Sequence, residues 1–284
     1  MVNQGLTREQ FKQLSSFIHD QVGIRMPPSK KIMLEGRLRK RLKTLGMDSF
    51  SQYLEYLFSN RGLDEELVHM IDVITTNKTE FFRESRHFDF LLQEALPQLI
   101  TLCGAGIKRT LMVWSAGCST GEEAYTLAMM LSEFGKKYPG LDFDFRILAT
   151  DVSTRVLEIG ARGVYLEEKT KDIPLALKHE YLMRSKDKEK KLVRFIPGLR
   201  AKVRFRRLNF LQEDFGFREH MDIIFFRNVL IYFDKPTQEK ILGKIIGYLR
   251  PEGYLFMGHS ETLLELRLPI KQTAPTVYKR VENR

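Results

Sequence analysis

Hydrophobic residues in the first 77 positions recur at helical spacing rather than in the alternation of strands. Thr7 and Gln10 form a capping-box pattern ahead of the first such segment, which should end near Gly23. The sequence therefore predicts an all-α domain at residues 1–77. Its four expected helices span about residues 7–23, 29–46, 49–59 and 63–76.

From about residue 110 the pattern changes, and short apolar runs alternate with amphipathic segments. Strands that alternate with helices in this way are typical of a parallel α/β sheet. We therefore expect a second domain of the α/β class. Its expected strands lie at about 111–115, 143–150, 221–226 and 254–257, and its expected helices at about 122–137, 154–162 and 237–249.

The basic segment from about residue 185 to 207 fits neither element of this alternation. Two short runs of strand-like sequence, 192–196 and 202–205, flank a Pro-Gly pair. Such a pattern favours a hairpin. We expect a small antiparallel β-subdomain inserted here.

Length and composition place the chain among globular proteins. Its 284 residues suffice for one large domain or two ordinary ones. No apolar run approaches the ~20 residues that span a bilayer, and the N-terminus lacks a signal-peptide pattern. Cys103 and Cys118 are too few for a disulfide framework, and the six histidines show no metal-ligand spacing. We therefore expect a cytoplasmic protein with no metal and no direct membrane insertion.

The formal net charge of +10 is concentrated in two clusters. Residues 184–207 hold eleven lysines and arginines, and residues 30–43 hold seven. A basic surface of this kind suits nucleic acid, anionic lipid or an acidic protein partner. Charge alone leaves these three partners open.

A glycine-containing turn lies between an expected strand and helix, at residues 116–121. Gly117 and Gly121 permit tight backbone geometry and close approach of a ligand. The turn lacks the G-x-G-x-x-G pattern of a pyrophosphate site, and Glu122 and Glu123 at the helix start would repel a phosphate. A ligand with positive charge and no phosphate, such as S-adenosylmethionine, fits this turn.

Polar residues also follow the other expected strands. Asp151 ends the second strand, where an acid can bind both hydroxyls of a ribose; with Ser153 it could instead cap the next helix. Asn209 and the backbone of Phe210 could meet an adenine ring. Since the carboxyl ends of parallel strands lie along one edge of a sheet, these residues predict a nucleoside site there.

Four longer strings resemble the CheR-type chemotaxis receptor methyltransferases, and the resemblance covers nearly the whole chain. The strings are residues 75–84 (TTNKTEFFRE), 114–123 (WSAGCSTGEE), 226–234 (FRNVLIYFD) and 258–261 (GHSE).

The resemblance implies a Rossmann-like S-adenosylmethionine-dependent methyltransferase domain at 91–284, with the small β-subdomain at about 185–207. Residues 78–90 would be a linker that folds over the cofactor, and S-adenosylhomocysteine would be the product. The family often has leucine where Phe210 stands, a small departure if the backbone makes the contact. By resemblance, Tyr232 is the catalytic tyrosine, and we expect Arg83 to act with it by orienting the incoming carboxylate and the cofactor. The cofactor contacts implied by the turn and by the resemblance are Asn77, Thr79, Arg83, Ala116, Gly117, Glu123, Asp151, Asn209, Phe210, Arg227 and Asn228.

The implied reaction is methylation of glutamate side chains on chemotaxis receptors, for sensory adaptation. A glutamate carboxyl is already ionised at neutral pH, so its methylation requires no general base. The enzyme must align the reacting atoms and remove water. This agrees with a sequence that shows no Ser/His/Asp or Cys/His arrangement.

The second expected helix suggests how the substrate is recognised. At 100° per residue, Lys30, Arg37, Lys40 and Arg41 fall on one face, beside a stripe of leucines. This face could simply be solvated. In light of the resemblance, we expect it to dock on the acidic helical cytoplasmic region of a transmembrane receptor. Whether the β-subdomain also binds a receptor's C-terminal peptide stays open, as does the oligomeric state.

Two rival functions use the same cofactor turn. A nucleic-acid methyltransferase would explain the positive charge, but the Pro-Pro-Tyr pattern that holds a flipped adenine is missing after residue 226. We therefore expect no nucleic-acid partner. A non-catalytic S-adenosylmethionine-binding signalling module would lose residues 77–83 or Tyr232, and both are present.

Overall fold

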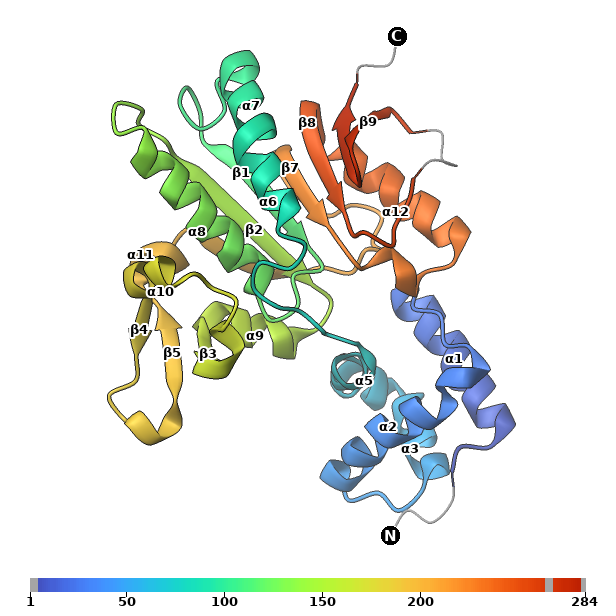
Figure 1. Ribbon diagram of the computed structural model, residues 1–284. Coiled ribbons are helices and arrows are strands. Elements are labelled where there is room, and N and C mark those ends of the chain that lie inside the picture. The colour runs from blue at the N-terminus through green and yellow to red at the C-terminus, as the bar shows by residue number, and fades with distance from the viewer. Residues whose placement is uncertain (1–4, 264–267, 282–284) are drawn as a thin grey trace.

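The computed structural model describes residues 5–263 and 268–281, and Figure 1 shows a group of helices below a sheet that is flanked by further helices. The lower group is the expected helical domain. The capping box at Thr7 is confirmed, and Gly23 ends the first helix in a left-handed conformation, as predicted. The helices are α1 (Arg8–Val22), α2 (Lys31–Leu45), α3 (Phe50–Leu57), α4 (Asn60–Glu65) and α5 (Leu67–Ile74).

One predicted helix of this domain is wrong in detail. The helix expected over 63–76 begins earlier and is broken at Glu66, which gives α4 and α5. The side chain of Ser59 accepts a backbone N–H of the first turn and so starts α4. Glu66 turns its carboxylate inward, where Arg41 donates to it at 2.6 Å and Tyr53 at 3.0 Å. Glu66 therefore joins the break to α2 through its ion pair with Arg41, and to α3 through its hydrogen bond with Tyr53.

Residues 75–85, which we call the strap, lead from the helical domain to the α/β domain without regular structure. A continuous helical segment follows, made of α6 (Arg86–Phe90), a π-helical turn (Leu91–Ala95) and α7 (Leu96–Cys103). The expected linker at 78–90 therefore overlaps both the strap and α6.

The α/β domain contains a seven-stranded sheet in the order β6-β2-β1-β7-β8-β10-β9. The first five strands in this order run parallel, which confirms the predicted parallel sheet, and β10 is antiparallel to both of its neighbours. Strands β9 and β10 were not expected. The strands are β1 (Leu111–Ala116), β2 (Phe145–Asp151), β6 (Val203–Arg207), β7 (Met221–Phe226), β8 (Leu249–Met257), β9 (Ile270–Ala274) and β10 (Val277–Arg280).

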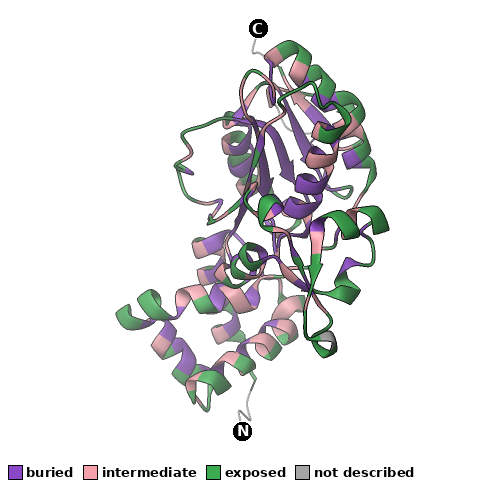
Figure 2. Ribbon diagram, turned by 90° about the vertical axis from the view of Figure 1, so that its left-hand side faces the viewer, coloured by how far each residue is buried: buried purple, intermediate pink, exposed green. Residues whose placement is uncertain are grey.

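Helices cover both faces of this sheet (Figure 1). One face packs on α6, α7, α8 (Glu122–Lys137) and α9 (Thr154–Arg162), and the other on α12 (Lys235–Gly247) and the helical domain. The central strands are buried on both sides, as their purple colour in Figure 2 shows, and every residue of β7 is buried. No helix of the described residues is both long and apolar enough to cross a bilayer.

The hairpin expected between 192–196 and 202–205 is wrong. β5 (Leu192–Phe195) pairs with β3 (Val164–Leu166) and β4 (Leu182–Arg184) in a separate three-stranded antiparallel sheet. β6 instead joins the edge of the main sheet, parallel to β2. A short helix, α11 (Pro197–Arg200), turns the chain between the two sheets, and α10 (Leu175–Tyr181) precedes β4. The small subdomain is therefore real, but it begins near residue 164 and ends before β6.

Candidate functional site

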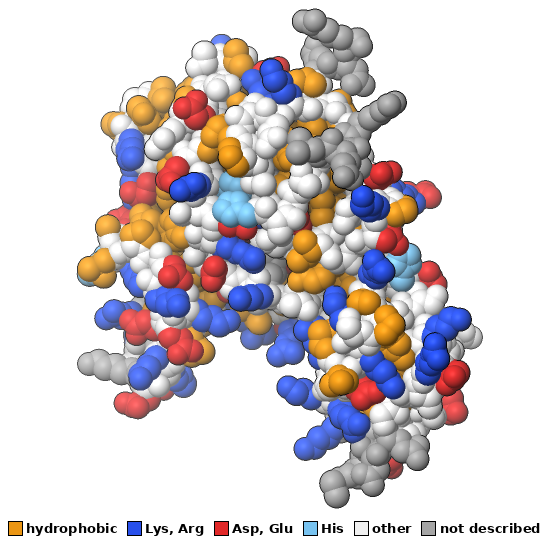
Figure 3. Space-filling view, turned by 45° about the vertical axis from the view of Figure 1, so that its right-hand side comes forward, with side chains coloured by type: hydrophobic (Ala, Val, Ile, Leu, Met, Phe, Trp, Pro, Cys, Tyr) orange, Lys and Arg blue, Asp and Glu red, His pale blue; other side chains and the backbone are white. Residues whose placement is uncertain are grey.

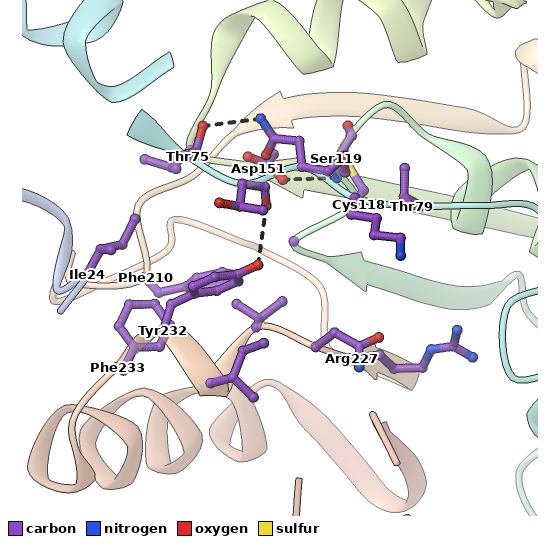
Figure 4. Close-up of a pocket in the computed structure, with 18 of the residues that line it drawn as sticks. Ile24, Thr75, Thr79, Cys118, Ser119, Asp151, Phe210, Arg227, Tyr232 and Phe233 are labelled. Carbon is purple, nitrogen blue, oxygen red and sulfur yellow. Dashed lines mark hydrogen bonds between the residues drawn. The ribbon is translucent and has the colours of Figure 1, made fainter. Parts of the chain in front are cut away.

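A cavity of about 330 Å³ lies where the carboxyl ends of the parallel strands meet the strap and the helical domain. Figure 4 shows Phe210, Tyr232 and Phe233 grouped at one end and Arg227 pointing away from them at the other. Among the predicted cofactor residues, Ala116 is buried at the end of β1 and does not line the cavity. The predicted residues that do line it are Lys30, Asn77, Thr79, Arg83, Gly117, Glu123, Asp151, Asn209, Phe210, Arg227, Asn228 and Tyr232.

The glycine turn is closed by contacts that only glycine permits. Gly117 has a φ of +81°, and a Cβ there would lie 2.5 Å from a methyl group of Val229. Asp151 fastens the turn, because its carboxylate accepts the backbone N–H of Ser119 at 2.9 Å and that of Ser153 at 3.0 Å. Burial raises the pKa of Asp151, and these backbone donors oppose the rise. Asp151 thus organises the turn and also presents an acid to the cavity.

The side chains of the two acids at the start of α8 point in different directions. Glu123 faces the cavity, where it accepts the hydroxyl of Ser115 at 2.6 Å. Burial raises its pKa, and Arg227 opposes the rise. Glu122 bends back to the hydroxyl of Thr120 and does not line the cavity, which corrects the expectation that both acids face the ligand. A positively charged ligand would therefore meet one acid of this pair.

Arg227 is buried and holds the strap in place. Its Nη2 donates to the backbone carbonyl of Arg83 at 2.7 Å, and its Nη1 lies 3.1 Å from Nδ1 of His87. Its Nε lies 3.0 Å from a Glu123 oxygen. The guanidinium also lies beside the stacked rings of Phe88 and Phe225, 5.6 and 5.7 Å from their ring centres. Two of its nitrogens hydrogen-bond to the protein, while the buried Nε forms an ion pair without a hydrogen bond, so Arg227 shapes the cavity as well as lining it.

The strap adopts strained backbone conformations beside the cavity. Phe82 and Glu84, on either side of Arg83, have φ values of +57° and +55°, a region that non-glycine residues rarely occupy. The Ser119 hydroxyl donates to the backbone carbonyl of Asn77 at 3.1 Å and joins the strap to the glycine turn. Strain of this kind persists only where the surroundings enforce it.

The loop after β7 depends on a residue to which no role was assigned from the sequence. Glu261 is 5% exposed, and its carboxylate accepts the backbone N–H groups of Asn228, Leu230 and Gly258, each at 2.8 Å. Asn228 has a φ of +59°, and a Cβ at Gly258 would lie 2.5 Å from its side chain. The string at residues 258–261 therefore shapes the loop formed by the string at residues 226–234. One sign of this role was visible in the sequence: an acid in the 258–261 string for which the predicted reaction had no use.

Tyr232 stands at the mouth of the cavity, next to the exposed Ile231. Its hydroxyl donates to the backbone carbonyl of Thr76 at 3.4 Å, and Nζ of Lys30 lies 5.7 Å from its ring centre. Burial raises the pKa of Tyr232, so the hydroxyl stays protonated at neutral pH. It can donate a hydrogen bond and cannot serve as a base.

Asn209 joins the two domains. Its side-chain nitrogen donates to the backbone carbonyl of Gln21 at 2.7 Å, and its oxygen accepts the N–H of Leu211 at 3.0 Å. Phe210 is buried with its ring on the cavity wall. The edge expected to meet an adenine ring is therefore also a domain contact.

These residues fit S-adenosylmethionine. The wall formed by Ile24, Phe210 and Val229 is apolar and can cover a flat base. Glu123 and Asp151 place two carboxylates in the same cavity, which favours positive charge and hydroxyl groups and disfavours phosphate. Glu123, whose oxygens already contact Ser115 and Arg227, can also accept from an ammonium group, and Asp151 can offer its oxygens to ribose hydroxyls.

A cluster of possible metal ligands lies behind this cavity. Glu84, His87 and His259 have ligand atoms within 4.8 Å of one another. Both ring nitrogens of His87 already have partners, Arg227 and the hydroxyl of Thr276. A neighbouring guanidinium would also repel a cation. The cluster is better described as a hydrogen-bond network that supports the strap.

The four predicted docking residues separate into two places. Lys30 lines the cofactor cavity, whereas Arg37, Lys40 and Arg41 line an adjoining groove between α2, α5 and α9. Arg37 donates to the backbone carbonyl of Thr75 at 2.9 Å, and Arg41 is paired with Glu66. Lys40 is exposed. The two arginines therefore have structural partners that the sequence did not reveal.

Known proteins are similar to this chain in sequence and in the order of their domains. The family description "CheR methyltransferase, all-alpha domain" matches residues 9–75, and "CheR methyltransferase, SAM binding domain" matches residues 77–278. The chain is 38% identical to the chemotaxis protein methyltransferase of Borreliella burgdorferi, over 98% of this chain and 96% of that one. It is 37% identical to chemotaxis protein methyltransferase 2 of Pseudomonas aeruginosa, over 96% and 93%, and 37% identical to the Escherichia coli protein, over 96% and 91%. The chain therefore belongs to the CheR methyltransferase family, and S-adenosylmethionine is its cofactor.

Proposed function

We propose that this methyltransferase converts glutamate side chains of chemoreceptors to methyl esters, with S-adenosylhomocysteine as the second product. The observation that carries this proposal is the continuity of two sites. The cofactor cavity shares Met33, Thr75 and Asn77 with the groove that Lys40 lines. An acidic helix in that groove would present a carboxylate at the edge of the cavity.

The surface charge supports an acidic substrate. Lysine and arginine side chains rim the hollow between the helical domain and the small antiparallel sheet (Figure 3). Arg155, from α9, faces the same groove from the side opposite α2. The excess positive charge on the α2 wall would attract an acidic helix and raise its rate of encounter, although Glu158 and Asp72 also line the groove.

The cofactor-binding roles follow from the cavity. We assign Glu123 to an ammonium group, Asp151 to ribose hydroxyls, and Phe210 with Asn209 to the adenine. Arg227 and Asn228 fix the shape of the floor. The strap, through Asn77, Thr79 and Arg83, covers the bound molecule and excludes water, which strengthens every charge interaction beneath it.

The reaction needs alignment more than proton transfer. When bound, S-adenosylmethionine supplies an electrophilic methyl group on a positively charged sulfur. A substrate glutamate is already ionised at neutral pH, and Tyr232 remains protonated. We assign Tyr232 and Arg83 to hold the incoming carboxylate by hydrogen bonding and charge. Apolar neighbours such as Ile231 would exclude water from it.

A transfer assay tests the proposal. Purified protein, radiolabelled S-adenosylmethionine and receptor-containing membranes should give protein-bound label that mild alkali releases as methanol. Methylated amines and bases survive such alkali, so stable label on nucleic acid would instead indicate the rival nucleic-acid methyltransferase. Cofactor binding with no transfer to membranes or nucleic acid would indicate a non-catalytic module. Glu123→Gln is the control for cofactor dependence, since loss of the carboxylate assigned to the ammonium group should weaken cofactor binding and reduce the transfer of label.

A further inference from the structure

The main sheet leaves part of one face open. Helices α8 and α9 pack on the face of β2 that carries Ile147 and Ala149. Arg146 and Leu148 point to the opposite face, because side chains alternate along a strand. The connection from β6 to β7, residues 208–220, contains no helix, although a doubly wound sheet usually has a covering helix at such a connection.

This open face forms a groove of about 530 Å³ that we call the arginine groove. Its apolar lining includes Met112, Leu148 and Phe217. Arginines from three segments surround this lining, and Glu219 is the single acid among the groove's lining residues. The arginines are Arg146, Arg204, Arg206 and Arg218, and all four are exposed.

The groove keeps an excess of positive charge, because the four arginines are only partly offset by nearby acids of the described residues. None of the four arginines takes part in a salt bridge within the described part of the chain. Arg206 donates to the backbone carbonyl of Phe215 at 2.9 Å and lies 5.1 Å from the ring centre of Phe217. Both of these partners are uncharged, while Asp214 and Asp144 lie near Arg206 and Arg146 without forming an ion pair and offset part of their charge. Four guanidinium groups around an apolar lining therefore remain available to an anionic partner.

We propose that the arginine groove docks an acidic amphipathic helix of a partner protein. Such a helix would supply an apolar stripe for the lining and carboxylates for the rim, and it would complete the missing helical layer. Arginine is well suited to this role, because its planar fork binds carboxylates in a bidentate manner. A single phosphate would leave the apolar lining of Met112, Leu148 and Phe217 uncovered, whereas an amphipathic helix would use both the lining and the arginines.

Docking at this groove would leave the cofactor cavity accessible. The two sites have no lining residue in common. A partner bound there would localise the enzyme or bring it to its substrate without competing for S-adenosylmethionine. Trp114 offers a built-in reporter, because it is the only tryptophan of the chain and its ring centre lies 5.0 Å from that of Phe217.

The test uses the full chain and a fluorescein-labelled synthetic helix of about 18 residues, or five turns, with leucine on one stripe and glutamate elsewhere. We expect saturable binding, measured by anisotropy, and a parallel change in the fluorescence of Trp114 with unlabelled peptide. Arg204→Glu should weaken binding about tenfold or more. Arg146→Glu, on the neighbouring strand, should also weaken peptide binding. Because the two variants are independent, a folding defect in one of them would leave the other to test the proposal.

Lys12→Glu is the matched control, since it makes the same charge change at an exposed position of α1. Equal weakening by Lys12→Glu and Arg204→Glu would overturn the proposal, because binding would then depend on net charge alone. A single-stranded oligonucleotide or a phosphatidylglycerol vesicle that binds through Arg204 while the peptide does not would overturn the choice of a helix. Cofactor affinity should be unchanged in every variant.

Discussion

Arg227 and Glu123 meet at the floor of the cofactor cavity, with Nε of the arginine 3.0 Å from a carboxylate oxygen. The same guanidinium reaches the backbone carbonyl of Arg83 in the strap. One side chain therefore connects the acid assigned to the cofactor with the segment assigned to cover it. The charge balance beneath the strap depends on this contact.

Replacing Arg227 with lysine keeps the charge but cannot reach both partners. We expect the affinity for S-adenosylhomocysteine to fall about tenfold or more, because the strap loses its anchor. Isothermal titration calorimetry measures this directly. Arg83→Ala is the informative comparison: Arg227 uses the backbone carbonyl of Arg83, so this variant should retain the anchor. An unchanged affinity in Arg227→Lys would rule out the anchoring role.

Glu261→Gln should impair the loop that carries Asn228 and Tyr232. A glutamine presents an NH2 group to at least one of the backbone N–H groups that the carboxylate now accepts, and leaves that donor unpaired. We expect kcat to fall about tenfold. Binding of S-adenosylhomocysteine should weaken less, because Glu123 and Asp151 are untouched. Ser260→Ala, at the exposed neighbouring position, serves as the control, and equal losses in both variants would count against Glu261 as a positioning residue.

Tyr232→Phe separates binding from turnover. The ring would still pack in the cavity, and only the hydroxyl would be lost. We expect the affinity for the cofactor to stay within about twofold while kcat falls about tenfold or more, as for an interaction used in the reaction itself. Single-turnover methylation of receptor membranes checks this. If binding and turnover both matched the unaltered enzyme, the hydroxyl would have no catalytic role.

A charge reversal that tests docking on α2 must avoid residues that already have partners within the protein. Lys40→Glu should raise the KM for receptor, most strongly at low ionic strength, and leave cofactor affinity unchanged. Arg41→Glu is a misleading variant for this purpose, since it leaves the buried Glu66 without its partner. We expect it to lower the free energy of unfolding by roughly 3 kcal/mol. Urea denaturation distinguishes the two effects, and an unaltered receptor KM for Lys40→Glu at low salt would contradict docking on this face.

The buried His87 predicts how stability depends on pH. Burial, with the charge of Arg227 beside it, lowers the pKa of His87 to about 4; Glu84 opposes this effect, and His259 adds to it. The unfolded chain therefore binds a proton between about pH 6.5 and about pH 4 that the folded protein does not, so this group reduces stability as the pH falls through that window. His87→Gln removes the contribution. The difference in melting temperature between the two proteins should change in favour of the variant as the pH falls, and a constant difference would show that His87 does not titrate this way.

Local patterns in the sequence predicted the elements that depend on neighbouring residues. The capping box at Thr7 and the left-handed Gly23 at the end of α1 are examples. The parallel strands were equally visible, because their apolar runs are nearly continuous. The pairing of β6 with β2 could not be predicted in this way, because β2 lies some fifty residues earlier. The basic, alternating sequence of 203–207 is also equally typical of a hairpin.

The side-chain partners within the site were beyond the reach of the pattern. Helical periodicity placed Arg37 and Arg41 on one face but could not show that a backbone carbonyl of the strap and the carboxylate of Glu66 would engage them. Glu122 and Glu123 are adjacent in sequence, yet a helix turns consecutive side chains about 100° apart and only one faces the cavity. Long-range contacts of this kind emerge only from the packed fold.

The proposed role of the strap has a kinetic consequence, because the segment assigned to cover the cofactor is also the only stretch of chain that joins the two domains. With the strap in that role, exchange of S-adenosylhomocysteine for a fresh cofactor would require residues around Arg83 to move away from the cavity. A receptor helix held against Lys40, beside Thr75, would resist that movement. Turnover should therefore follow a compulsory order, in which the cofactor loads first and the methylated receptor departs before the spent cofactor leaves.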